Sequence, residues 1–212
     1  MKLLMAMLGA ALLVLPGALQ AQERDVQDKD YKQDKDFKKG QDQPKKGDQM
    51  PQYQPGKEHQ ALKQWDGEWE FKSKCTMPGQ ETQEGQGTET VKTTLGGFWL
   101  EIEDKGTMMG KEWTGKGFMG FDPNKKQYCG VWLDSWMPFI ARFEGDADST
   151  GKVFTFKMMG EDPKTGKPMT DRMVFEWKDQ DHRTLRFYTK DESGKEMMMS
   201  EIQYTRKPAM IK

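Results

Sequence analysis

The sequence predicts an all-β protein, an antiparallel closed barrel of about ten strands with a short helix before it. From Lys57 to Arg206, short alternating or aromatic-rich runs are separated by turn clusters at regular intervals. Within each run apolar and polar residues alternate, so that every strand has one apolar face. No run has the length and 3.6-residue period of a substantial helix, so the crossover helices of a parallel sheet are not expected.

The individual elements follow from these runs and from the turns between them. The segment "KEHQALKQW" predicts the short helix. Turn residues in "DPNK", "DADSTGK", "EDPKTGKP", "KDQD" and "KDESGK" supply the Gly, Pro or Asp that tight hairpins need. Strands are expected near residues 68–76, 86–95, 98–105, 112–121, 126–134, 138–146, 152–159, 170–178, 183–190 and 196–206.

The alternation sorts the side chains into two faces. The outer face is charged, for example at Glu101 and Glu103. A sheet with one apolar face must cover it, and a chain without long helices does so by closing into a barrel; a two-sheet sandwich is the competing solution. Ten strands leave room for an interior cavity. The apolar face comprises Trp69, Phe71, Phe98, Leu100, Ile102, Phe139, Ala141, Phe143, Phe154, Phe156, Met158, Met173, Phe175, Trp177, Leu185, Phe187, Ile202 and Tyr204.

Glycines and cysteines add two local expectations. Glycines inside the predicted strands, at Gly115, Gly117, Gly120 and Gly130, indicate sharp bends or a close approach to the backbone. Cys75 and Cys129 fall in the first and fifth strands, which are not neighbours in a sequentially wound barrel. A disulfide needs α-carbons within about 7 Å, so we expect two unpaired thiols, although an oxidising compartment would permit one bond.

The first 55 residues differ in kind from the barrel. Residues 1–21 have the layout of a signal peptide, with cleavage expected after Ala21 and export to the periplasm or outside. Its apolar run is too short for a membrane span. Residues 22–55 form a charged, disordered linker that carries the repeat "QDKDYK" and "QDKDFK". It is a solvated spacer, or else Tyr31 and Phe37 contact a partner. The barrel domain is expected over 56–207, with a tail at 208–212.

Two groups of residues resemble a known family. "WDGEWEF" in the first strand and "YTRK" in the last resemble the calycin (lipocalin-like) pattern, in which Gly67, Trp69 and Arg206 are structural and the guanidinium covers the indole. The longer runs "HQALKQWDGEW", "LGGFWLEIEDKGTMMGKEWTGKGFMGFDPNKKQYCGVWLDS", "EDPKTGKPMTDRMVFEW" and "SEIQYTRK" resemble the DUF1579 family over residues 58–207. The resemblance implies a lipocalin-like barrel and no established reaction.

The hairpin "GFMGFDPNKKQYCGVWLDSWM" holds the most informative polar residue. Alternation places Trp132, Asp134 and Trp136 on one face. If this face looks inward, Asp134 is an acid near two indoles, suited to hydrogen bonding a ligand. In the alternative interpretation, Asp134 ends its strand and caps the "SWMP" turn while the indoles pack.

Metal, haem and nucleic-acid binding are not favoured. Thioethers suit Cu(I), but the clusters "TMMG", "KMMGE" and "EMMMSE" lie near strand ends on separate hairpins, which favours flexible core filling. Neither His59 nor His182 falls on a clear inward strand face, so a haem of the nitrobindin kind is not expected. The formal net charge of −1 argues against nucleic-acid binding. Hydrolase motifs and phosphate loops are absent from the sequence, and we expect no metal and no cofactor.

Binding of a small apolar or amphipathic ligand inside the barrel is therefore the leading hypothesis for function. A filled barrel acting through its tail or outer surface, and a barrel enzyme of isomerase or lyase type, are the alternatives. The expected ligand-binding residues are Trp69, Phe71, Phe98, Trp132, Asp134, Phe154 and Tyr204.

Overall fold

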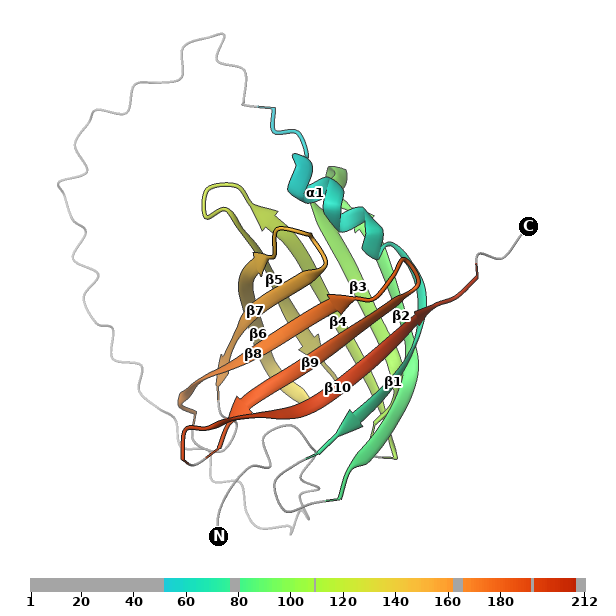
Figure 1. Ribbon diagram of the computed structural model, residues 1–212, viewed down its shortest axis with the longest axis vertical. Coiled ribbons are helices and arrows are strands. Elements are labelled where there is room, and N and C mark those ends of the chain that lie inside the picture. Colours follow the sequence, from blue (N-terminus) through green and yellow to red (C-terminus); the bar gives the residue numbers. More distant parts are fainter. Residues whose placement is uncertain (1–51, 77–80, 109, 162–165, 192, 209–212) are drawn as a thin grey trace, which may run out of the picture. The chain divides into compact units, whose positions relative to one another are not determined.

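A computed structural model describes residues 52–76, 81–108, 110–161, 166–191 and 193–208 (Figure 1). The predicted signal peptide, the hexapeptide repeat and residues 209–212 lie outside the described residues. Within the described ranges, no helix combines the length and apolar character that a membrane-spanning helix requires.

Two short helical turns precede ten strands, as the sequence predicts. The turns are α1 (Lys57–Leu62) and η1 (Lys63–Trp65), and a third, η2 (Leu95–Gly97), precedes the third strand. The strands are β1 (Gly67–Cys75), β2 (Gln83–Thr94), β3 (Trp99–Met108), β4 (Lys111–Asp122), β5 (Gln127–Asp134), β6 (Met137–Ala147), β7 (Val153–Glu161), β8 (Pro168–Trp177), β9 (His182–Lys190) and β10 (Glu196–Arg206).

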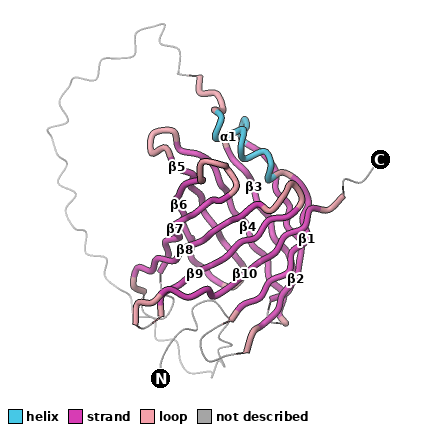
Figure 2. Tube along the Cα trace, in the orientation of Figure 1, coloured by secondary structure: helices cyan, strands magenta, loops and turns pink. Residues whose placement is uncertain are grey.

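The strands form a closed antiparallel barrel, and the sandwich alternative is thereby wrong. Each strand pairs with its neighbours in sequence, and β1 pairs with β10 to complete the ring (Figure 2). Closure turns the apolar face inward and so buries it without a covering helix. It also leaves the sheet without a free edge. The predicted alternation is confirmed: in β1, Trp69 and Phe71 are buried while Glu68, Glu70 and Lys72 are exposed.

The end of the barrel where β1 begins is covered by α1 and η1 (Figure 1). Leu62 and Trp65 are buried in the core, and Trp65 packs edge-on against Phe154 and Phe175. The backbone carbonyl of Trp65 accepts a hydrogen bond of 3.0 Å from the indole nitrogen of Trp69. The short helix therefore closes this end of the barrel and leaves the opposite end uncovered by a helix in the described chain.

The predicted contact between Trp69 and Arg206 joins the first strand to the last. The two residues are directly paired in the β1–β10 ladder, and the guanidinium carbon lies 4.0 Å from the indole centroid. Gly67 makes this possible: its φ is +138°, and a β-carbon there would lie 2.7 Å from the Arg206 guanidinium. The guanidinium also donates to three main-chain carbonyl oxygens, those of Gln64, Asp66 and Gln180.

The strand glycines receive aromatic rings from the adjacent strand. A β-carbon at Gly115 or Gly117 would lie 2.1 Å or 2.7 Å from the Trp132 ring, and one at Gly130 would lie 2.3 Å from Phe143. The expected close approach is confirmed, and its purpose is to let bulky rings lie flat on the barrel wall.

Both cysteines are unpaired, as predicted from their strand positions. Cys75 lies at the end of β1 and Cys129 lies in β5, and three strands separate them in the barrel. Burial raises the pKa of both thiols, so they remain protonated at neutral pH.

Replacing Arg206 with Met should lower the free energy of unfolding by about 2 kcal/mol, because the cation–π contact and the charged hydrogen bonds to main-chain carbonyls are both lost. Urea unfolding monitored by tryptophan fluorescence measures this change. The adjacent Lys207→Met is the matched control, for which we expect less than about 0.5 kcal/mol. Equal effects of the two substitutions would show that the barrel seam does not depend on this contact.

Candidate functional site

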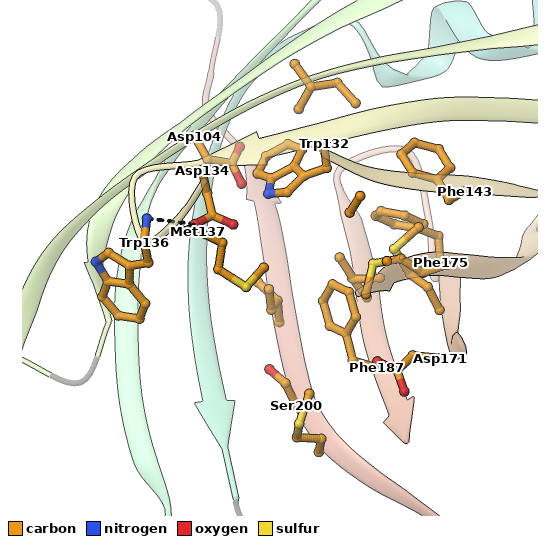
Figure 3. Close-up of a pocket in the computed structure, with 18 of the residues that line it drawn as sticks. Asp104, Trp132, Asp134, Trp136, Met137, Phe143, Asp171, Phe175, Phe187 and Ser200 are labelled. Carbon is orange, nitrogen blue, oxygen red and sulfur yellow. Dashed lines mark hydrogen bonds between the residues drawn. The ribbon is translucent and has the colours of Figure 1, made fainter. Parts of the chain in front are cut away.

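A cavity of about 190 Å³ occupies the half of the barrel away from α1. Its wall combines aromatic rings and methionines from most of the strands (Figure 3). Phe139 and Ile140 also line it and are 39% and 50% exposed, so the cavity reaches the surface beside the first part of β6. The pairs between β6 and β7 begin at Arg142 and Met159, so within the described residues 137–141 have no ladder partner on the β7 side.

A buried ion pair forms the inner boundary of this cavity. Arg183 from β9 and Glu89 from β2 are 1% and 3% exposed, and the guanidinium contacts the carboxylate. The pair reaches past β10 and β1, which lie between these two strands in the barrel. An isolated charge in such a place would be costly, so each group depends on the other.

Aromatic rings enclose the Arg183 guanidinium. Its central carbon lies 4.6 Å from the ring centroids of both Trp65 and Trp69, and 4.4 Å from that of Tyr204. These contacts partly replace the water that the cation loses. Burial lowers the pKa of Arg183 to about 9, which still leaves the group charged at neutral pH.

Two further carboxyl groups are buried in the cavity wall. Asp104 from β3 and Asp171 from β8 are 5% and 6% exposed, and in each the Oδ1 atom has no hydrogen-bond partner. Burial raises the pKa of Asp104 to about 8. Burial likewise raises the pKa of Asp171, although a hydrogen bond from Thr189 acts in the opposite direction. Asp104 is therefore mostly protonated at neutral pH unless a cation lies beside it.

Asp134 caps the β5–β6 turn and also lines the cavity. Its Oδ1 atom accepts backbone hydrogen bonds of 2.8 Å from Trp136 and 3.1 Å from Met137 (Figure 3). The Trp136 indole nitrogen donates to the Glu112 carbonyl oxygen at 3.1 Å. The capping interpretation is thus confirmed. Asp134 nevertheless also lines the cavity, so the two interpretations do not exclude each other.

The remaining predicted ligand-binding residues divide into two groups. Trp132 and Tyr204 line the cavity together with Asp134. Trp69, Phe71 and Phe154 are buried in the core, but they are not among the residues of the cavity wall. Phe98 precedes β3 and packs edge-on against His59, with ring centroids 5.2 Å apart, so it belongs to the covered end of the barrel.

Four inward charged residues were not predicted from the sequence, and they are Glu89, Asp104, Asp171 and Arg183. The alternation contains a signal for each of them. Extending the alternation of Leu100 and Ile102 by one step reaches Asp104, and the same step leads from Met173 to Asp171 and from Leu185 to Arg183. Glu89 is likewise one step from the buried Val91 in β2, and it lies opposite Asp104 in the β2–β3 ladder.

The methionines converge on the cavity from their separate hairpins. Cavity-lining methionines come from β3, β4, β6, β7, β8 and β10, and they are Met108, Met119, Met137, Met158, Met169, Met173 and Met199. Flexible thioethers give a wall that adapts to the shape of a guest. Over the described part of the chain, no group of three or more His, Cys, Asp or Glu side chains is placed to hold a metal ion. Neither His59 nor His182 lines the cavity.

A closed antiparallel barrel, covered at one end and hollow at the other, is the class that this fold and this cavity define. The family profile described as "Protein of unknown function (DUF1579)" matches residues 54–206, and the chain belongs to this family. No functionally curated protein matches the chain.

Two solved structures that are similar to the chain share little sequence with it. Rv2717c from M. tuberculosis is 12% identical with a TM-score of 0.53, over 72% of this chain and 99% of that one. The S-type phycobiliprotein lyase CPES from Guillardia theta is 12% identical with a TM-score of 0.48, over 71% of this chain and 92% of that one. At this identity the likeness to Rv2717c concerns the fold alone.

Replacing Arg183 with Met should lower the free energy of unfolding by about 3–5 kcal/mol, because the Glu89 carboxylate is left buried without its partner. The double variant Arg183→Met/Glu89→Leu should recover more than half of this loss, since both charges are then gone. Chemical unfolding of the two variants and the wild type measures the difference. A double variant no more stable than the single one would show that the pair itself stabilises the barrel.

The raised pKa of Asp104 predicts a pH dependence of stability. The folded chain keeps a proton on Asp104 between about pH 4 and pH 8, where the unfolded chain has released it. The free energy of unfolding should therefore fall as pH rises through this window, by roughly 1 kcal/mol per pH unit relative to Asp104→Asn. Urea unfolding of both proteins at several pH values tests this, and parallel curves would contradict it.

Proposed function

We propose that this protein binds a small, largely apolar molecule in the cavity of its barrel and that it does so after export. The cavity carries this proposal. It measures about 190 Å³, larger than the engineered cavity of about 150 Å³ that takes up benzene. A guest of one or two rings therefore fits the available space.

The composition of the wall supports binding rather than simple packing. A barrel stabilised only by its core would gain from filling this volume, because an unfilled cavity costs stability in proportion to its size. Here, instead, aromatic and thioether side chains surround an open space, and a few polar groups point into it. Small-molecule sites have this make-up, mostly apolar with a few polar groups that fix orientation.

The cavity also has a route to solvent. Phe139 and Ile140 place apolar surface at its rim, on the stretch of β6 that lacks pairs with β7 in the described chain. A ligand entering there meets apolar side chains first, which suits an apolar or amphipathic molecule. This supports binding inside the barrel over a function confined to the outer surface.

Filling the cavity should abolish binding without unfolding the barrel. Ala141 lies opposite Trp132 in the β5–β6 ladder and lines the cavity. Ala147 lies on the same face of the same strand but does not line the cavity. We expect Ala141→Phe to weaken binding of apolar probes such as ethylbenzene and indole at least about tenfold, and Ala147→Phe to change it little. Isothermal titration calorimetry measures both, with thermal unfolding as the check on folding.

Native mass spectrometry of protein recovered from the periplasm identifies the guest. The mass of the chain in the same measurement shows whether the exported protein begins at Gln22. No retained mass and no probe binding by the wild type would refute the binding function. Equal probe affinity of the two alanine variants would place the binding elsewhere than this cavity.

A further inference from the structure

One row of the barrel gathers three acids on neighbouring strands. Glu89 in β2 is directly opposite Asp104 in β3, which is opposite Gly115 in β4, which is opposite Asp134 in β5. All three acids line the cavity, and Figure 3 shows Asp104 and Asp134 beside Trp132. Like charges directly opposite each other in a ladder are destabilising, so each carboxyl in this row needs a partner.

Two of the three acids have partners within the protein. Glu89 pairs with Arg183, and Asp134 accepts two backbone hydrogen bonds in the turn that follows it. The Oδ1 atom of Asp104 has none, although the side chain is 5% exposed. Asp104 is thus the acid of this row that is left for a guest.

Indole rings lie next to this unpartnered carboxyl. Trp132 lies over Gly115, which is the residue directly opposite Asp104, and it stacks on Trp113 with centroids 6.0 Å apart and an interplanar angle of 26°. The absence of a side chain at Gly115 is what allows the ring to lie there. Indole faces carry partial negative charge and attract cations.

Acidic side chains outnumber basic ones in the wall of the cavity. Among the described residues that line the cavity, Arg183 is the one basic side chain, and it is already paired. The titratable groups around Asp104 come from seven other strands and are Cys75, Glu89, Asp134, Glu161, Asp171, Arg183 and Tyr204. This excess of acid over base favours a positively charged guest.

We propose that the guest is a small organic cation, an amine on an apolar body of one or two rings, and that its ammonium group binds Asp104 against the Trp132 and Trp113 indoles. This inference rests on the proposed binding function and names its ligand class. Asp171 is the less suited acid, because Thr189 already donates to it.

The test compares two probes of equal shape, 2-phenylethylamine and the neutral 2-phenylethanol, by calorimetry on the wild-type chain. The amine should bind at least about tenfold more tightly at pH 8. Because Asp104 releases its proton when the ammonium binds, amine affinity should rise up to about tenfold per pH unit from pH 6 to pH 8. Affinity for the alcohol should stay constant over this range.

Asp104→Asn, which keeps the shape of the side chain, should remove both the preference for the amine and its pH dependence. Asp171→Asn is the matched control in the same cavity and should keep both.

If the alcohol binds as tightly as the amine at every pH, the proposed positive charge of the guest is wrong while the binding function stands. If neither probe binds and no guest is retained, the binding function fails. Loss of the preference in Asp171→Asn alone would overturn the assignment to Asp104. The pH series needs no substitution, so it decides the point even if a variant fails to fold.

Discussion

The core of the barrel is lined by aromatic and aliphatic side chains, so a charge buried there needs a partner. This constraint explains the pair of Arg183 and Glu89, the most buried ion pair among the described residues. Aromatic rings surround the guanidinium and separate it from solvent on several sides. The pair links β9 to β2 across the seam, so the two ends of the ribbon are joined inside the barrel as well as along the β1–β10 ladder.

Strand register converts the same constraint into a site. Because consecutive strands pair without crossovers, residues far apart in sequence come to lie on one row, and a glycine in such a row leaves space for a ring. The Trp132 ring uses the space at Gly115, between two acids. The glycines therefore allow the aromatic rings to lie close to the strands. Rings in this position leave the centre of the uncovered end of the barrel open.

Much of the fold could be predicted from alternation alone, because a half-buried strand must display its faces with period two. The ten strands follow in this way, whereas the short helix was predicted from its own segment and the contact of Trp69 with Arg206 from the resemblance to the calycin pattern. The contents of the cavity depend on more than alternation. Phe98 looked inward by its spacing, but it belongs to the covered end, because its strand begins one residue later. Inward charges such as Arg183 were not predicted, because the inward face was traced through its apolar residues alone and the partner Glu89 lies on a strand far away in sequence.

The unpaired first stretch of β6 has a kinetic consequence. Where two strands are paired, a molecule passing between them would have to break ladder hydrogen bonds, which requires local unfolding. Beside residues 137–141 there is no ladder on the β7 side to break. Opening this gap requires rotation of exposed side chains such as Ile140, which takes picoseconds to nanoseconds, and does not require separation of strands. The barrel can thus remain rigid while its contents turn over.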